Sequence, residues 1–319
     1  MFPDFDHINL YNWLFPKIQN FCSDISKIKS LSQNFKKDDY IFYFGDSVIE
    51  RISKFDKDQR TIDQLLEAKQ KNSYKIACLS HSAYHMGIYY PLISVLVKNK
   101  YIPKYLIVPI NMRSFSPQWF FEPSWQFDYE IKLINKFLDN PNSRVFRYFP
   151  KKMRGSYNKY LNINIDYPLV PFKKIKEFVE WEHKFPIDND EFNYRKKVIF
   201  IFHYLYKLNG SHIRLNQLIN ICDIVSNTDI KIILYVTPIN FRAGIKFVGC
   251  EFLNYFNDNL KIISNAMARF EYCENIKFID LSTRFSPNLF FHDDLATEHL
   301  NENGRNMLVN ILSEELPKL

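Results

Sequence analysis

The sequence predicts an α/β protein: a three-layer α/β/α sandwich around a five-stranded parallel sheet, with one insertion. Short segments rich in β-branched and aromatic residues alternate with amphipathic helical segments along the chain. This order requires crossover connections, which make neighbouring strands parallel. Apolar residues make up 46% of the 319 residues, which is enough for a large core. Residues 115–195 lack the alternating rhythm, are richer in proline, aromatic and charged residues, and are predicted to be the insertion.

The predicted strands are short and are followed by residues that favour turns. The first is YIFYF, residues 40–44, which runs directly into a glycine, one of only 7 in the chain. Its bulky apolar residues predict a buried strand that ends in a turn. The other strands are predicted at residues 74–80, 104–111, 230–240 and 276–282.

The predicted helices connect these strands and cover the sheet. Helical periodicity is found at residues 60–72, 89–99, 252–270 and 301–316, and residues 1–36 also have helical spacing. In the predicted helix 89–99, Pro91 is tolerable only in the first turn. Residues 198–228 are predicted to form the crossover between the third and fourth strands. We expect the whole chain, 1–319, to be one domain, with the insertion over the carboxyl edge of the sheet.

Charge and cysteine content exclude several classes of partner and cofactor. The net charge is +7, but the basic residues are scattered among acids instead of forming one face, which argues against a nucleic-acid partner. The five cysteines include no CxxC pair, so neither a disulfide framework nor a zinc site is predicted. Walker A, GxGxxG, HExxH and GxSxG motifs are absent, and the sequence predicts no cofactor.

The sequence also leads us to expect a soluble, cytoplasmic protein. Its first fifteen residues contain acids and no basic flank before an apolar run, which is unlike a signal peptide. The apolar run MGIYYPLISVLV falls well short of the roughly 20 residues that span a bilayer, so stable membrane insertion is not expected. The oligomeric state stays open.

Polar residues follow the predicted strands at the points where ligands bind in open parallel sheets. Gly45, Asp46 and Ser47 follow the first strand, SHSAYHMG follows the second, and Asn111 follows the third. The fourth is followed by TPINFRAG, and a loop ending in FFHDDLATEHLNENG follows the fifth. The topology therefore predicts that serine, asparagine, histidine and acidic side chains converge on one edge.

In four blocks the chain resembles the SGNH (GDSL-type) hydrolase superfamily, which has a flavodoxin-like sandwich. FGDSV, ACLSHSAY, PINMRS and TEHLNENGRNML stand in the order of the four blocks and span residues 41–310. The resemblance implies that Ser47 is the nucleophile and His299 the general base. It further implies an oxyanion hole made of the Ser47 N–H, the Ala83 N–H and the Asn111 side-chain amide, with alanine where the family usually has glycine.

These residue types suit acyl transfer. A serine hydroxyl is a poor nucleophile until a base takes its proton, and a histidine can do so near neutral pH. The tetrahedral oxyanion needs donors already in place, and losing one costs roughly 3–4 kcal/mol. Structural alternatives stay open at this point: Ser47 as a turn residue, His299 as a residue at a helix terminus, and Asn111 as a cap.

The acid of the triad is missing from its usual place. The family has DxxH, whereas Ala296 stands three residues before His299. Asp294 is the first candidate to orient the histidine and Asp293 the second, while Glu298 is expected to point away. A Ser–His dyad oriented by a carbonyl or water is the alternative.

Other polar residues have simpler interpretations. His81 and His85 are four residues apart, but no third ligand stands at a matching spacing for zinc. His292 is expected in an exposed loop, and Arg113 in a surface ion pair instead of on an anionic substrate. The aromatic residues of segment 114–127 fit either a substrate pocket or packing of the insertion.

We therefore predict a serine esterase that acts on O-acyl esters of small molecules or glycans through an acyl-serine, with O-acetyl esters as the leading substrate class. The alternatives are an O-acyltransferase in surface-polysaccharide assembly and a catalytically silent protein that binds a glycan or another protein. The substrate, the acyl chain length and the choice between hydrolysis and transfer stay open.

Overall fold

The computed structural model of the protein describes residues 40–70, 73–100, 102–139, 153–184 and 189–318, so the predicted helical region 1–36 lies outside it. Within these residues, five parallel strands form a sheet in the order β2-β1-β3-β4-β5, with helices on both faces. This confirms the predicted fold class. The strands are β1 (Tyr40–Gly45), β2 (Lys75–Ser80), β3 (Tyr105–Ile110), β4 (Lys231–Val236) and β5 (Ile276–Asp280).

The alternation of side chains along each strand supplies a hydrophobic core on both faces of the sheet. In β1, Phe42 and Phe44 enter one core, whereas Ile41 and Tyr43 enter the other. All residues of β1 are buried, as expected for a strand with neighbours on both sides. The YIFYF run is apolar throughout because both of its faces pack against helices.

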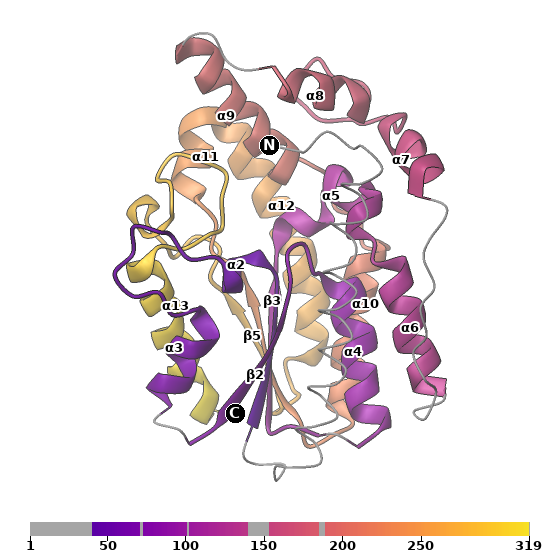
Figure 1. Cartoon of the computed structure of the whole chain (residues 1–319), viewed down its shortest axis with the longest axis vertical. Helices are drawn as coiled ribbons and strands as arrows, with labels where there is room; N and C mark the ends of the chain where they lie inside the picture. Colours follow the sequence, from indigo (N-terminus) through magenta and orange to yellow (C-terminus); the bar gives the residue numbers. More distant parts are fainter. Residues whose placement is uncertain (1–39, 71–72, 101, 140–152, 185–188, 319) are drawn as a thin grey trace.

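Two sets of helices form the outer layers (Figure 1). Helices α3 (Ile62–Lys69) and α13 (Glu302–Glu315) pack on one face of the sheet. Helices α4 (Met86–Lys98), α10 (Ile213–Ser226) and α12 (Cys250–Met267) pack on the other. The remaining helix after β4 is α11 (Phe241–Val248). None of the helices in the described ranges is long and apolar enough to cross a bilayer.

The predicted position of Pro91 is wrong. Helix α4 begins at Met86, because the Nδ1 atom of His85 accepts a hydrogen bond from the Gly87 N–H at 3.0 Å and caps the first turn. Pro91 therefore lies inside the helix, in its second turn. Strong burial of α4 against the sheet and α10 offsets the hydrogen bond that this proline cannot donate.

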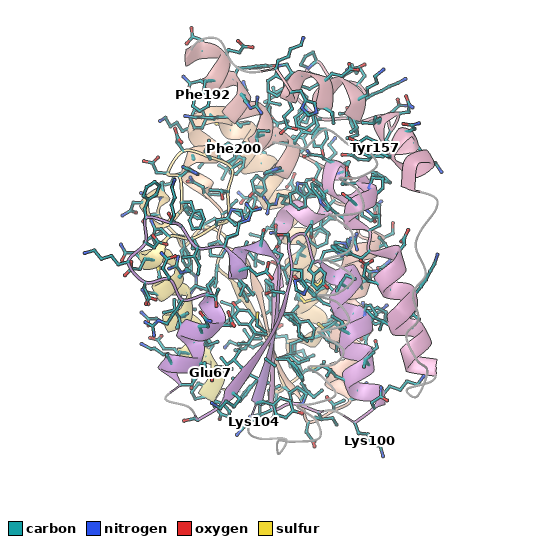
Figure 2. All side chains as sticks on the ribbon, viewed as in Figure 1. Glu67, Lys100, Lys104, Tyr157, Phe192 and Phe200 are labelled. Atoms are coloured by element: carbon teal, nitrogen blue, oxygen red, sulfur yellow. The ribbon has the colours of Figure 1, made fainter. Side chains whose placement is uncertain are left out.

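The segment between β3 and β4 is helical. Figure 1 shows α7, α8 and α9 beyond the end of the sheet where α2 (Ser47–Glu50) begins. Phe192, near the start of α9, is 44% exposed, whereas Phe200 is buried, so the helix runs from the surface into the core (Figure 2). The division into one domain with an insertion stays a prediction. The helices are α5 (Pro117–Phe121), α6 (Asp128–Asp139), α7 (Met153–Leu161), α8 (Ile175–Glu182) and α9 (Asn189–Tyr204).

Candidate active site

Ser47 lies at the turn between β1 and α2, as the glycine after YIFYF suggested. A Cβ atom on Gly45 would lie 2.0 Å from Ile49 Cδ1 and 3.2 Å from Ser80 Cβ, so no larger residue fits without movement. Asp46 caps α2, because its Oδ1 accepts a hydrogen bond from the Val48 N–H at 2.8 Å. Ser47 is only 6% exposed. Glycine therefore provides space for a tight turn that presents the serine.

His299 lies within hydrogen-bond distance of Ser47, with 3.1 Å between Ser47 Oγ and His299 Nε2. The residues around the histidine explain the HLNENG sequence. Asn301 caps α13 by accepting the Gly304 N–H at 3.1 Å, and its Nδ2 donates to the Asn288 carbonyl at 2.7 Å. A Cβ on Gly304 would lie 2.2 Å from the Leu289 carbonyl oxygen. Cap and glycine together bring the start of α13 against the preceding loop and fix the path of His299.

The other nitrogen of His299 contacts a hydroxyl group. Thr297 Oγ1 lies 3.1 Å from His299 Nδ1 and also accepts a hydrogen bond from the His299 N–H at 3.1 Å. The Asp294 carboxylate instead forms an ion pair with Lys196 of α9, and Asp293 is exposed. The structure thus brings Ser47 and His299 together. At His299 Nδ1, where the sequence predicted an acid, it places Thr297, which the sequence reasoning missed. The only sequence signal for it was a hydroxyl residue two positions before the histidine.

A threonine at this position leaves two tautomers of the His299 imidazole possible, because a hydroxyl can either donate a hydrogen bond to Nδ1 or accept one from it. If Nδ1–H donates to Thr297 Oγ1, then Nε2 carries a lone pair that can take the proton of Ser47. If the threonine donates, Nε2 carries the hydrogen and cannot act as the base. A carboxylate would accept only, so it would enforce the first tautomer.

Asn111 is held by its neighbours in one orientation. Its Oδ1 accepts the Arg113 N–H at 3.0 Å, and its Nδ2 donates to Asp46 Oδ2 at 2.8 Å. One of the two hydrogens on Nδ2 therefore goes to Asp46, and the second is available for another acceptor. The cap and donor roles of Asn111, which were alternatives in the sequence, are compatible.

Ala83 adopts the backbone conformation of a glycine. Its φ is 66°, and the Tyr84 N–H donates to the His81 carbonyl at 3.0 Å, which makes Ala83 the third residue of a tight turn. A positive φ at this place is the requirement of a type II turn, where glycine is favoured. Within the described ranges, neither the Ala83 N–H nor the Ser47 N–H has an acceptor.

The surroundings of His299 favour its neutral form. Burial is the main cause, and the positive charges of Arg113 and Arg51 add to it, so the pKa of His299 is lowered to about 3. Burial also raises the pKa of the Asp46 carboxyl, although Arg113 and the bonds from Val48 and Asn111 oppose this. The imidazole is thus available as a base at neutral pH but holds a proton weakly.

Two further histidines of the sequence analysis have separate partners. His81 Nδ1 lies 3.4 Å from Glu50 Oε1, whereas His85 Nε2 lies 2.6 Å from the Trp125 carbonyl oxygen. His85 Nδ1 also lies 2.5 Å from Nη1 of Arg214 and must accept there, because a guanidinium only donates. His85 therefore serves to cap α4 and to hold Arg214.

Arg113 and the aromatic segment lie closer to the core than the sequence suggested. Arg113 was expected in a surface ion pair, but its pair with Glu298 is buried, with side-chain exposures of 7% and 0%. Its guanidinium lies 4.1 Å from the ring centroid of Trp119, which stacks on Trp125 with 4.0 Å between centroids. His292 is exposed, as predicted.

No family model and no curated protein matches the chain. Among solved structures, it is similar to a GDSL-like lipase from Bacteroides thetaiotaomicron, at 8% identity and a TM-score of 0.42, covering 94% of this chain and 98% of that chain. It is also similar to a family two carbohydrate esterase from Clostridium thermocellum, at 12% identity and a TM-score of 0.40, covering 88% and 65%. An acetyl-xylooligosaccharide esterase from Geobacillus is similar at 11% identity and a TM-score of 0.39, covering 88% and 96%. In the described residues the sequence blocks stand at the carboxyl ends of β1, β2 and β3 and at the start of α13, on a parallel sheet of order β2-β1-β3-β4-β5.

Proposed function

We propose that the protein is a serine esterase of the SGNH type, which acts on O-acyl esters through an acyl-serine intermediate. The observation that carries the proposal is the distance of 3.1 Å between Ser47 Oγ and His299 Nε2. A nucleophile in contact with a base, and a base held in turn by a third group, is the arrangement that activates serine. Here the third group is Thr297.

The reaction follows from these contacts. Ser47 Oγ attacks the carbonyl carbon of the ester while its proton passes to His299 Nε2. The oxyanion accepts hydrogen bonds from the N–H groups of Ser47 and Ala83 and from the second Nδ2 hydrogen of Asn111. The intermediate collapses as the alkoxide leaves and takes the proton from the imidazolium. Water then attacks the acyl carbon while His299 Nε2 takes its proton. The second tetrahedral intermediate collapses to the carboxylic acid as the imidazolium returns this proton to Ser47 Oγ.

Thr297 sets the expected level of activity. A neutral hydroxyl stabilises the imidazolium less than a carboxylate does, and burial already disfavours that cation. We therefore propose a slow esterase for which O-acetyl esters, including those on glycans, are the first substrates to examine. Acyl transfer to a sugar hydroxyl uses the same steps with a different acceptor, so product analysis with and without a sugar separates the two reactions.

The proposal is tested by labelling with a fluorophosphonate probe, with the adduct mapped by peptide mass spectrometry. We expect an adduct on Ser47 of the wild type, and none in Ser47→Ala or His299→Ala. Ser53→Ala is the matched control, since Ser53 lies in the exposed loop after α2. A folded wild-type protein that forms no adduct at Ser47 would refute the esterase and favour the silent binding protein.

A further inference from the structure

A buried ion pair connects two of the loops that form the candidate site. Nη2 of Arg113 lies 2.8 Å from Oε2 of Glu298, although its N–H is not directed along a hydrogen bond. The Tyr204 hydroxyl donates to the other carboxylate oxygen of Glu298. With the guanidinium also stacked on Trp119, both charged groups have fixed positions.

Stability alone does not account for such a pair. Removing two charges from water costs several kcal/mol per ion, and apolar side chains of similar volume often give equal or greater stability. Glu298 is fully buried and Arg113 nearly so, so both bear this cost. An ion pair, unlike a pair of apolar side chains, can fix the orientation of the two groups that it joins.

On one side, the pair is linked through the Arg113 backbone to the Asn111 amide. Arg113 is two residues beyond Asn111, and its N–H donates to Asn111 Oδ1 at 3.0 Å. With Oδ1 occupied, Nδ2 must face Asp46, to which it donates at 2.8 Å. Anchoring the side chain of Arg113 therefore anchors the amide that we assign to the oxyanion hole.

On the other side, the pair is linked through the chain to His299. Glu298 is peptide-bonded to His299, whose Nε2 lies 3.1 Å from Ser47 Oγ. Asp46, the acceptor for Asn111, is peptide-bonded to Ser47. The contacts thus form a closed ring that runs through the ends of β1 and β3 and the loop before α13. The ring consists of Ser47, His299, Glu298, Arg113, Asn111 and Asp46.

We propose that Arg113 and Glu298 are positioning residues, whose ion pair fixes the Asn111 amide and the His299 imidazole relative to Ser47. Neither residue is assigned a contact with substrate, and the inference rests on the proposed function. Misplacement of reacting groups by about 1 Å can lower a rate by roughly 100-fold, so the pair matters to the reaction out of proportion to its effect on stability.

The test is the double variant Arg113→Met/Glu298→Leu, which removes both charges at similar volume. It is combined with Tyr204→Phe, because the buried Tyr204 hydroxyl donates to Glu298 and would otherwise lose its acceptor. We expect its melting temperature to stay near that of the wild type, while the rate of fluorophosphonate labelling at Ser47 falls roughly 10- to 100-fold. With a small acetyl ester, kcat should fall and KM should stay unchanged. A purely structural pair would lower stability and leave the rate per folded molecule intact.

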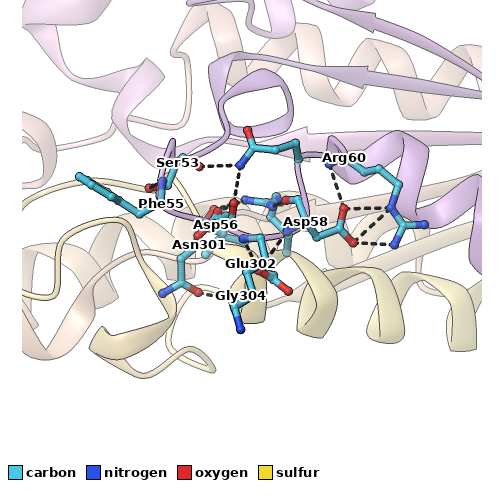
Figure 3. A network of polar contacts seen from close by, with 12 residues as sticks. Ser53, Phe55, Asp56, Asp58, Arg60, Asn301, Glu302 and Gly304 are labelled. Carbon is cyan, nitrogen blue, oxygen red and sulfur yellow. Dashed lines mark hydrogen bonds and ion pairs between the residues drawn. The ribbon is translucent and has the colours of Figure 1, made fainter.

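The matched control is Arg305→Met/Asp56→Asn. This pair is also buried, but it joins the loop after α2 to α13, and neither of its residues belongs to the ring. Figure 3 shows Asp56 of that loop near Asn301 and Glu302 at the start of α13. We expect the control to lose stability, because Arg305 also donates to the carbonyls of Leu300 and Asp58, and to keep its labelling rate within about twofold. Labelling of the Arg113/Glu298 double variant at the wild-type rate would refute the inference while leaving the esterase intact. A wild type that does not label would instead refute the proposed function, and the inference with it.

Discussion

Replacing Thr297 with valine tests whether the hydroxyl does the work that an acid does in related sites. Valine has almost the shape of threonine but cannot accept the Nδ1–H of His299, which lies 3.1 Å from the hydroxyl oxygen. In the transition state the imidazolium of His299 donates this bond from Nδ1 to the Thr297 hydroxyl. The bond is therefore charge-assisted and contributes about 1.5–3 kcal/mol to transition-state stabilisation. At about 1.4 kcal/mol per factor of ten, the labelling rate of Ser47 should fall roughly 10- to 150-fold.

The assay is the pseudo-first-order rate of fluorophosphonate labelling, normalised to the folded fraction. Thr297→Ser keeps the hydroxyl and is the matched control, expected near the wild-type rate. Thr297→Asp supplies an acceptor-only group that fixes the base-competent tautomer, so it should label faster than the wild type. If Thr297→Val labels as fast as the wild type, the hydroxyl does not orient His299, and the site works as a bare Ser–His pair.

Three further results are expected. Ala83→Gly should raise the free energy of unfolding by about 1 kcal/mol, because a φ of 66° strains an alanine but not a glycine. Chemical denaturation measures this difference, and a lower stability of the glycine variant would contradict the strain. Burial lowers the pKa of His85 and His203 well below the ordinary value, so the unfolded chain binds protons there that the folded protein excludes. These two histidines alone should therefore lower the free energy of unfolding by about 3 kcal/mol between pH 8 and 5.5, whereas urea midpoints that do not move would rule this out. Because the pKa of His299 is about 3, its imidazole stays neutral and the labelling rate of Ser47 should be flat from pH 8 to 5; an inflection near pH 6.5 would show an ordinary histidine.

The strands and the tight turn that holds Ser47 could be predicted because their signals are local. YIFYF is apolar at every position, and Gly45 is required by the close approach of Ile49 in α2 and of Ser80 at the end of β2. His299 was identifiable for a similar reason. The Asn301 cap and Gly304 that fix its place lie within five residues of it.

The partner of His299 could not be predicted because distant residues set the path of its loop. Asn240, at the start of α11, donates from Nδ2 to the carbonyls of His292 and Leu295, each at 3.3 Å. Asp294 is drawn to Lys196 of α9, almost a hundred residues earlier in the chain. The spacing of residues within DDLATEH carries no information about either contact. An acid of this segment was therefore predicted as the partner of His299.

The separation of Ser47 from His299 also bears on how the protein is made. The two residues are 252 positions apart in the chain, so the serine leaves the ribosome long before its base exists. At about 5–20 residues per second, the interval is roughly 13 to 50 s. Under the proposed function, the hydroxyl of Ser47 has no base throughout synthesis of that stretch. We therefore expect chains stalled on the ribosome before residue 299 to be inert toward the probe, and the completed protein to react with it.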